Sequence, residues 1–294
     1  MRKSIVGAMA LLISSLGSVN ANPPAPVPLN HFYLILDSAT YKAIEQHSFL
    51  RKEFAPTEQR TTTRTDMSYT GLYFYGTNTY FEFFDAASQA IGKLSDTGVA
   101  LGTDRPGTLE AIKTDLAGAF SIGAPITRGF NGKQVPWFYM AVPGNFPESS
   151  GLRVWVMEYH PRFLAEWNSQ SDSDNQGITR KQVLARYAAV LPNTPRTPYL
   201  KDVMALTLAV DEATAKKLIE LCQLLGYRRR VKGITTILQG EDVELRLVPQ
   251  TDSARGIQEI TMRVDRTPEY QREFRFGARS LLKFKGNGIA TWSF

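Results

Sequence analysis

LNHFYLILD, residues 29–37, is the stretch of sequence that decides the fold. Aromatic and branched side chains dominate it, which favours a buried β-strand, and a lone histidine, His31, lies near its start. A second aromatic stretch, TYFEFFD at residues 79–85, predicts another strand with Glu82 at its centre. A glutamate among four aromatic residues is costly to bury alone. We therefore expect Glu82 to meet a cation or a donor, and His31 is the candidate.

The first stretch opens a pattern of one strand, one helix and several strands. Asp37 or Ser38 supplies an N-cap for the helix, because short polar side chains accept from the first free N–H groups. The expected elements of this first module are a strand over 29–37, a helix over 39–54 and strands over 60–65, 69–75 and 79–85. Those of a second module are a strand at 99–101, a helix over 108–116 and strands over 137–142 and 152–159.

The second half of the chain repeats the pattern more weakly. The stretch from Asp211 to Leu218 echoes that from Asp37 to Ile44 at its Asp, Ala, Thr and Lys positions, which supports an internal repeat. Further strands are expected over 233–239 and 243–248, and a truncated fourth copy starts at 257–264 and ends at 289–294. The predicted units are a domain over residues 28–165, a linker with one helix over 166–199 and a diverged domain over 200–294.

Composition places the chain among globular proteins. Of its 294 residues 43% are hydrophobic and 11% aromatic, so a substantial core is available. The net charge of +6 is mild and no basic stripe with interleaved aromatic residues is present, so we expect no nucleic-acid partner. Cys222 is the single cysteine, which excludes an intrachain disulfide.

The N-terminus has the pattern of an export signal. Arg2 and Lys3 form a charged start, residues 5–19 are apolar or small, and the run from Val19 to Ala21 fits a small-residue cleavage site. We predict a signal peptide over residues 1–21 and a mature protein that is periplasmic or secreted. No later apolar stretch approaches the length of a membrane span, so we expect no membrane association after signal removal.

Tandem modules with a histidine in the first strand and a glutamate in the last resemble the vicinal oxygen chelate superfamily. That superfamily includes glyoxalase I, extradiol dioxygenases and bleomycin-resistance proteins. Residues 29–37 and 70–86 are closer still to an uncharacterised family of exported bacterial glyoxalase-like proteins. The resemblance covers residues 28–165 well and 200–294 weakly. It implies an α+β fold of tandem βαβββ modules, two in the N-terminal unit, followed by a diverged second unit.

The resemblance also implies a metal site, because in that superfamily the first and last strands of each module hold a metal in a shared cavity. It makes His31 and Glu82 the first module's ligands. Glu158 takes the place of the second module's final-strand carboxylate and is the candidate catalytic residue. Imidazole and carboxylate ligands suit a divalent zinc, iron, manganese or nickel ion. The alternative is that His31 hydrogen-bonds Glu82 and no metal binds.

The fourth ligand of such a site is missing from the sequence. Aligning Asp37 with Asp104 puts Gly98 at the position of His31, and glycine offers no side chain. His160 lies two residues beyond Glu158, hence on the same face of a strand, and is the candidate substitute.

Other side chains are candidates for binding a small molecule. Arg64 suits an anionic group, while Tyr73, Tyr75 and Trp137 suit a flat or apolar one. A solvated edge for Arg64 and ordinary core packing for the aromatic residues are the alternatives. Two functions remain open. The first is an exported metal-dependent lyase, isomerase or dioxygenase acting on a small molecule; the second is a non-catalytic small-molecule-binding protein of the bleomycin-resistance type, without a metal.

Overall fold

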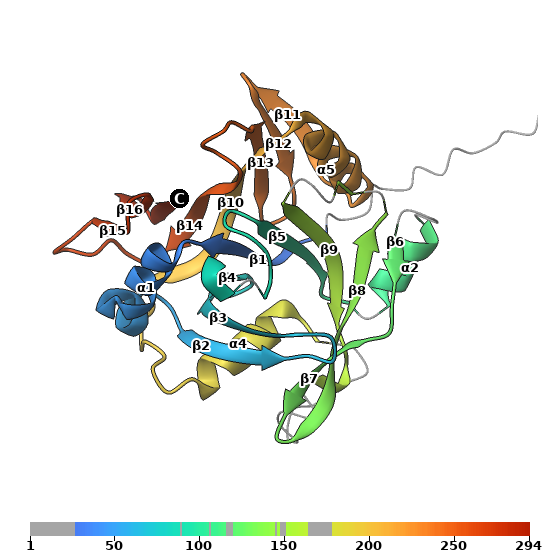
Figure 1. Ribbon diagram of the computed structural model, residues 1–294, viewed down its shortest axis with the longest axis horizontal. Coiled ribbons are helices and arrows are strands. Elements are labelled where there is room, and N and C mark those ends of the chain that lie inside the picture. The colour runs from blue at the N-terminus through green and yellow to red at the C-terminus, as the bar shows by residue number, and fades with distance from the viewer. Residues whose placement is uncertain are drawn as a thin grey trace, which may run out of the picture.

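The protein has an α+β fold that consists mostly of strands in two sheets, with few helices (Figure 1). The computed structural model describes residues 27–88, 90–105, 107–115, 120–144, 146–147, 151–163 and 178–294. The predicted signal peptide and the end of the first predicted domain, residues 164–165, lie outside these described residues. Within them, no helix is long and apolar enough to cross a membrane.

The first sheet contains nine strands from the N-terminal half of the chain. They are β1 (Leu29–Leu36), β2 (Thr57–Thr63), β3 (Ser68–Tyr75), β4 (Tyr80–Asp85), β5 (Thr97–Thr103), β6 (Phe120–Ile122), β7 (Ile126–Phe130), β8 (Lys133–Pro143) and β9 (Leu152–Tyr159). Their order is β2-β3-β4-β1-β5-β9-β8-β6, with β7 paired to β8. The central strand β1 runs parallel to β4 and antiparallel to β5.

Helices accompany this sheet at three places. They are α1 (Ser38–Gln46), α2 (Thr108–Asp115) and α4 (Arg180–Val190), with short turns of helix at Leu50–Phe54 and Ala86–Ser88. Asp37, not Ser38, is the N-cap of α1, because its carboxylate accepts from the Thr40 N–H at 2.9 Å. The predicted helix over 39–54 is broken at His47, which is the C-cap of α1.

The first sheet curls until its two sides meet. An isolated bridge between Arg64 and Arg128 joins the end of β2 to β7. α4 passes beside β2 and β3 (Figure 1), and its Tyr187 ring stacks on Tyr75 at 4.8 Å. Val183 and Leu184 of α4 are buried in the same aromatic cluster. The helix therefore fills part of the interior of the curled sheet.

The second sheet contains eight strands from the C-terminal part of the chain. They are β10 (Leu200–Val210), β11 (Arg228–Lys232), β12 (Thr235–Gln239), β13 (Glu244–Pro249), β14 (Gly256–Val264), β15 (Glu273–Phe276), β16 (Ser280–Gly286) and β17 (Ile289–Ser293). Their order is β11-β12-β13-β10-β14-β17-β16-β15. β10 is parallel to β13 and antiparallel to β14, as β1 is to β4 and β5.

The predicted sequence repeat corresponds to a repeated helix start. Asp211 caps α5 (Glu212–Leu224) by accepting from the Thr214 N–H at 2.8 Å, as Asp37 does for α1. The last copy differs, because β14 leads into β15, β16 and β17 through a fully described stretch that contains no helix. β14 and β17 are consequently antiparallel.

The two sheets share one hydrophobic core. It includes Phe32 and Phe83 from the first sheet and Trp292 from the last strand of the second. The Trp292 indole is fully buried and lies 5.2 Å from the Phe83 ring and 5.9 Å from the Phe54 ring. Folding of each half therefore depends on apolar surface supplied by the other.

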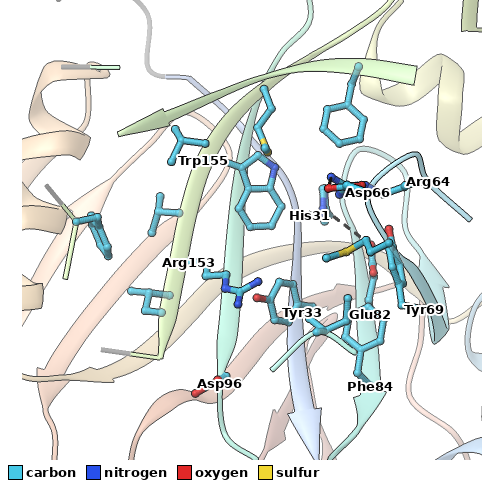
Figure 2. Close-up of a pocket in the computed structure, with 18 of the residues that line it drawn as sticks. His31, Tyr33, Arg64, Asp66, Tyr69, Glu82, Phe84, Asp96, Arg153 and Trp155 are labelled. Carbon is cyan, nitrogen blue, oxygen red and sulfur yellow. Dashed lines mark hydrogen bonds and ion pairs between the residues drawn. The ribbon is translucent and has the colours of Figure 1, made fainter. Parts of the chain in front are cut away.

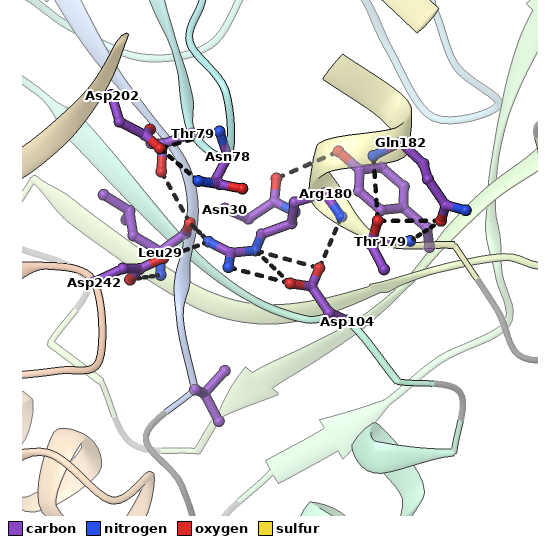
Figure 3. Close-up of polar contacts among 12 residues, drawn as sticks. Leu29, Asn30, Asn78, Thr79, Asp104, Thr179, Arg180, Gln182, Asp202 and Asp242 are labelled. Carbon is purple, nitrogen blue, oxygen red and sulfur yellow. Dashed lines mark hydrogen bonds and ion pairs between the residues drawn. The ribbon is translucent and has the colours of Figure 1, made fainter. Parts of the chain in front are cut away.

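A buried arginine at the start of α4 adds a polar link between the halves (Figure 3). The Arg180 guanidinium donates to Asp242 at 2.8 Å, to Asp104 at 3.1 Å and to the Leu29 carbonyl. Its side chain is 8% exposed, so losing any of these partners would leave a desolvated charge short of acceptors.

Replacing Trp292 with alanine should destabilise the whole chain. The substitution opens a cavity in the core that both sheets share, at an expected cost of about 3–5 kcal/mol in the free energy of unfolding. Urea unfolding followed by circular dichroism should show one transition, shifted to lower urea. Tyr270→Ala, at a side chain that is 65% exposed, is the control and should change little. A second half that unfolds separately while the first keeps its midpoint would contradict the shared core.

Candidate ligand-binding site

A cavity of about 800 Å³ opens on the first sheet. Its walls come from β1, β4, β8, β9 and the turn between β2 and β3, and most of its lining is aromatic or apolar. The aromatic lining residues are Tyr33, Tyr69, Tyr80, Phe84, Trp137, Phe138, Phe146 and Trp155. This size and lining are typical of pockets that bind small organic molecules.

The alternation of side chains along each strand explains why these residues face the cavity. His31 and Tyr33 of β1 line the cavity, whereas Phe32 and Leu34 between and beyond them face the shared core. β4 follows the same rule, with Glu82 in the cavity. Alternate residues of one central strand thus face the cavity and the shared core.

His31 and Glu82 lie together in this cavity, as the sequence predicts (Figure 2). The distance between His31 Nε2 and Glu82 Oε1 is 3.9 Å, too long for a direct hydrogen bond. His31 Nδ1 lies 2.9 Å from Asn30 Oδ1, which also accepts from the Tyr159 hydroxyl at 3.4 Å. Since that amide oxygen can only accept, Nδ1 carries the imidazole proton. The Nε2 lone pair therefore faces Glu82.

Burial makes this pair neutral near pH 7. Desolvation lowers the pKa of His31 to about 3 and raises the pKa of Glu82 to about 8. The Arg60 and Arg64 guanidinium groups act against desolvation at Glu82 without cancelling it. The imidazole also lies between two rings, stacked on Tyr80 at 4.5 Å and edge-on to Trp155 at 5.4 Å.

Two arginines line the cavity and differ in their surroundings. Arg64 forms a two-point ion pair with Asp66, at 2.8 and 2.7 Å, so its charge is already compensated. Arg153 is exposed and its guanidinium points toward the Tyr33 hydroxyl (Figure 2). No carboxylate among the described residues forms an ion pair with it. Desolvation raises the pKa of Tyr33 to about 12, although the nearby Arg153 lowers it.

The other residues predicted to bind substrate divide into two groups. Arg64 and Trp137 line the cavity. Tyr73 and Tyr75 do not line it, because they are packed deeper inside the curled sheet. The Arg60 guanidinium covers the Tyr73 ring at 4.3 Å, and the Tyr75 hydroxyl donates to Glu58 at 2.6 Å.

Glu158 does not join His31 and Glu82, because it lies on the opposite face of β9 from Trp155. Its carboxylate accepts from the Gly107 N–H at 2.9 Å, the Leu109 N–H at 3.0 Å and the Thr103 hydroxyl at 3.2 Å. These contacts are those of a carboxylate that stabilises the start of α2. The carboxylate oxygens of Glu158, the candidate catalytic residue, are therefore engaged by N–H groups at the start of α2.

His160 is also outside the cavity. It follows the last residue of β9, and its Nδ1 accepts from the Arg162 N–H at 3.2 Å. Its ring lies 5.4 Å from that of Tyr139. His160 is two residues from Glu158, as the sequence analysis noted, but it contacts neither His31 nor Glu82.

Strands β5 and β9 supply no further metal-ligating side chain to the cavity. Across β1 and β5, Tyr33 pairs with Gly98 and His31 with Ala100; across β5 and β9, Ala100 pairs with Trp155. A Cβ atom at Gly98 would collide with the Tyr33 ring, so glycine is required there. In the described part of the chain, no three His, Cys, Asp or Glu side chains gather as a metal-binding group. Two donors fall short of the three protein ligands usual at catalytic zinc sites.

Comparison with known proteins gives a family. A family model for proteins of unknown function, DUF5829, matches residues 29–294. The chain belongs to the DUF5829 family. No curated protein matches the sequence.

Among solved structures, a hypothetical protein from Staphylococcus aureus is similar to this DUF5829 chain in fold. The two share 11% sequence identity with a TM-score of 0.55, over 89% of this chain and 97% of that one. A fusion protein of a xylose isomerase-like TIM barrel and 4-hydroxyphenylpyruvate dioxygenase has a TM-score of 0.45 and 11% identity, over 87% of this chain and 39% of that one.

Several cavity residues were not predicted from the sequence. Asn30, Tyr33, Tyr80 and Arg153 act on the cavity or on its histidine, yet none was a candidate. Strand parity is the signal that identifies two of them, because Tyr33 is two residues from His31 and Tyr80 is two from Glu82. Arg153 is two residues from Trp155, which was not itself a candidate.

The buried pair predicts how the stability of this DUF5829 protein depends on pH. The pKa of Glu82 is 4.5 ordinarily and about 8 in the folded chain, so unfolding releases its proton over that window and stability falls as pH rises. The pKa of His31 falls from 6.5 to about 3, so its contribution rises with pH up to 6.5. Between pH 6.5 and 8 Glu82 acts alone, and the free energy of unfolding should fall by about 2 kcal/mol.

Urea unfolding at the two ends of that window measures this fall. Glu82→Gln should remove it, because an amide does not titrate. Glu241→Gln, at an exposed position, is the matched control and should keep it. A wild-type slope that survives in Glu82→Gln would show that another group titrates.

Proposed function

We propose that this DUF5829 protein binds a small organic molecule in the cavity of its first sheet, against His31 and Glu82. The observation that carries this proposal is a cavity of about 800 Å³ with a largely aromatic lining and one buried polar pair. Apolar walls supply affinity through the hydrophobic effect, and a few polar groups orient the ligand. We further propose that the protein acts outside the cytoplasm, as the N-terminal pattern predicts.

The proposal includes a finer description of the fold. β1 to β4 with α1 are taken as one glyoxalase-type βαβββ module, and β5, α2, β6, β8 and β9 as a second, with β7 as an additional strand paired to β8. Two features support this: β1 is parallel to β4, and β5 is parallel to β9. A ligand between such modules contacts the inward face of both central strands.

We prefer the ligand-binding proposal because the buried polar groups of the cavity, His31 and Glu82, are neutral and few. A neutral His31 and a protonated Glu82 can orient a ligand by one acceptor and one donor. This arrangement corresponds to the non-catalytic, bleomycin-resistance type of protein. It requires no residue beyond those that line the cavity.

The second candidate is a metal-dependent lyase, isomerase or dioxygenase. The observation in its favour is the contact of His31 Nδ1 with Asn30, which leaves Nε2 free toward Glu82. A hydrogen bond of this kind commonly fixes a metal-binding histidine. The number of donors is against it, because Glu158 and His160 are engaged elsewhere.

A neutral apolar probe tests ligand binding. Phenylnaphthylamine should bind with one site per chain and quench tryptophan fluorescence, because Trp137 and Trp155 line the cavity. Met140→Arg should weaken this binding about tenfold or more, since a charged side chain disrupts the apolar lining. Met204→Arg on β10, at an exposed methionine of the second sheet, is the matched control. Equal loss in both variants, or no binding to the wild type, would contradict the proposal.

Elemental analysis separates the two candidates. Protein purified without chelator should carry well under one zinc, iron, manganese or nickel ion per chain, and chelator should leave its melting temperature unchanged. Close to one ion per chain, lost in Glu82→Ala but kept in Glu244→Ala, would instead establish the metal-dependent candidate. Binding of a cation to the folded chain would also raise its melting temperature with metal concentration.

A further inference from the structure

We propose that the ligand of this cavity is a flat, apolar carboxylic acid, and that Arg153 and Tyr33 bind its carboxylate. This inference rests on the proposed ligand-binding function and names the chemical class of the ligand. Three observations support it: the charges of the cavity, the row of residues that brings Arg153 to Tyr33, and the aromatic walls beside that row.

Among the residues that the structure describes, the charges of the cavity leave one cation without a counter-ion. Arg64 is paired with Asp66, and Asp96 with Arg255 at 3.5 Å. His31 and Glu82 are both neutral near pH 7, because burial disfavours their charged forms. Arg153 is the remaining charged group that lines the cavity in the described part of the chain. The cavity is therefore selective for an anion.

Strand register explains how Arg153 reaches Tyr33. Arg153 pairs with Gly98 across β9 and β5, and Gly98 pairs with Tyr33 across β5 and β1. The three residues form one row across the sheet. Because Gly98 has no side chain, the Tyr33 ring lies over it and its hydroxyl meets the Arg153 guanidinium (Figure 2). A guanidinium and a phenol side by side offer several donors to one carboxylate.

The neighbouring row supplies a surface for a flat apolar group. His31, Ala100 and Trp155 occupy the next cavity-facing positions of the same three strands. Two residues along a strand span about 6.6 Å, close to the length of one aromatic ring with its substituents. A flat group can lie against the rings of His31 and Trp155, which line the cavity together with the Tyr69 ring. A carboxylate held by Arg153 thus places the apolar body of the ligand over this row.

A pair of probes with the same shape and different charge tests the inference. Naphthoate carries a carboxylate, whereas naphthamide replaces it with an uncharged amide of similar size. Isothermal titration at low salt should show that wild-type protein binds naphthoate at least about tenfold more tightly than naphthamide. Added salt should weaken the naphthoate complex alone, because Arg153 is exposed and its attraction for an anion is screened.

Substitutions then assign the preference to residues. Arg153→Gln should abolish the difference between the probes, Arg153→Lys should retain part of it, and Tyr33→Phe should reduce it several-fold. Arg263→Gln, at an exposed arginine on β14, is the control and should leave both affinities unchanged.

The outcomes distinguish this inference from the proposed function. Equal binding of the two probes, or a preference that survives Arg153→Gln, would overturn the carboxylate site while leaving the cavity as a binding site. Failure of naphthoate, naphthamide and phenylnaphthylamine to bind would overturn both proposals.

Discussion

The position of β1 in the middle of the first sheet constrains the rest of the molecule. All eight of its residues are buried, so both faces of the strand must be covered. The shared core covers one face and packs Phe32 and Leu34 against the second sheet. The curled sheet and α4 enclose the other face, where His31 and Tyr33 lie. The alternation of a β-strand therefore couples the stability of the fold to the chemistry of the cavity.

Burial in the cavity determines the charge state of its polar groups. His31 and Glu82 are 6% exposed each, and desolvation moves the pKa of each toward its neutral form. Arg64 lies nearer the solvent, and its ion pair with the exposed Asp66 compensates its charge. Arg153 avoids the cost of desolvation by lying at an exposed position, where its charge stays hydrated.

The sequence was sufficient for features that depend on local pattern. The aromatic strands, the helix starts at Asp37 and Asp211 and the meeting of His31 with Glu82 follow from composition, capping and strand periodicity. The sequence did not show that Glu158 would lie apart from His31 and Glu82, because that depends on which face of β9 it takes, and its carboxylate is at the start of α2. Short strands such as β6 and β7 were missed. Their pairing with β8 depends on contacts between segments rather than on local sequence.

Comparison of the two sheets explains why only one of them makes an enclosed, neutral site. In the register of β10 and β13, Ala205 and Arg246 occupy the positions that His31 and Glu82 hold in β1 and β4. Arg246 and Arg230 both donate to Glu244, a partly exposed carboxylate. Such pairs are tolerated because solvent reaches them, and they contribute little to binding an apolar ligand. The same arrangement of strands thus buries a polar pair in a cavity where the sheet closes on itself.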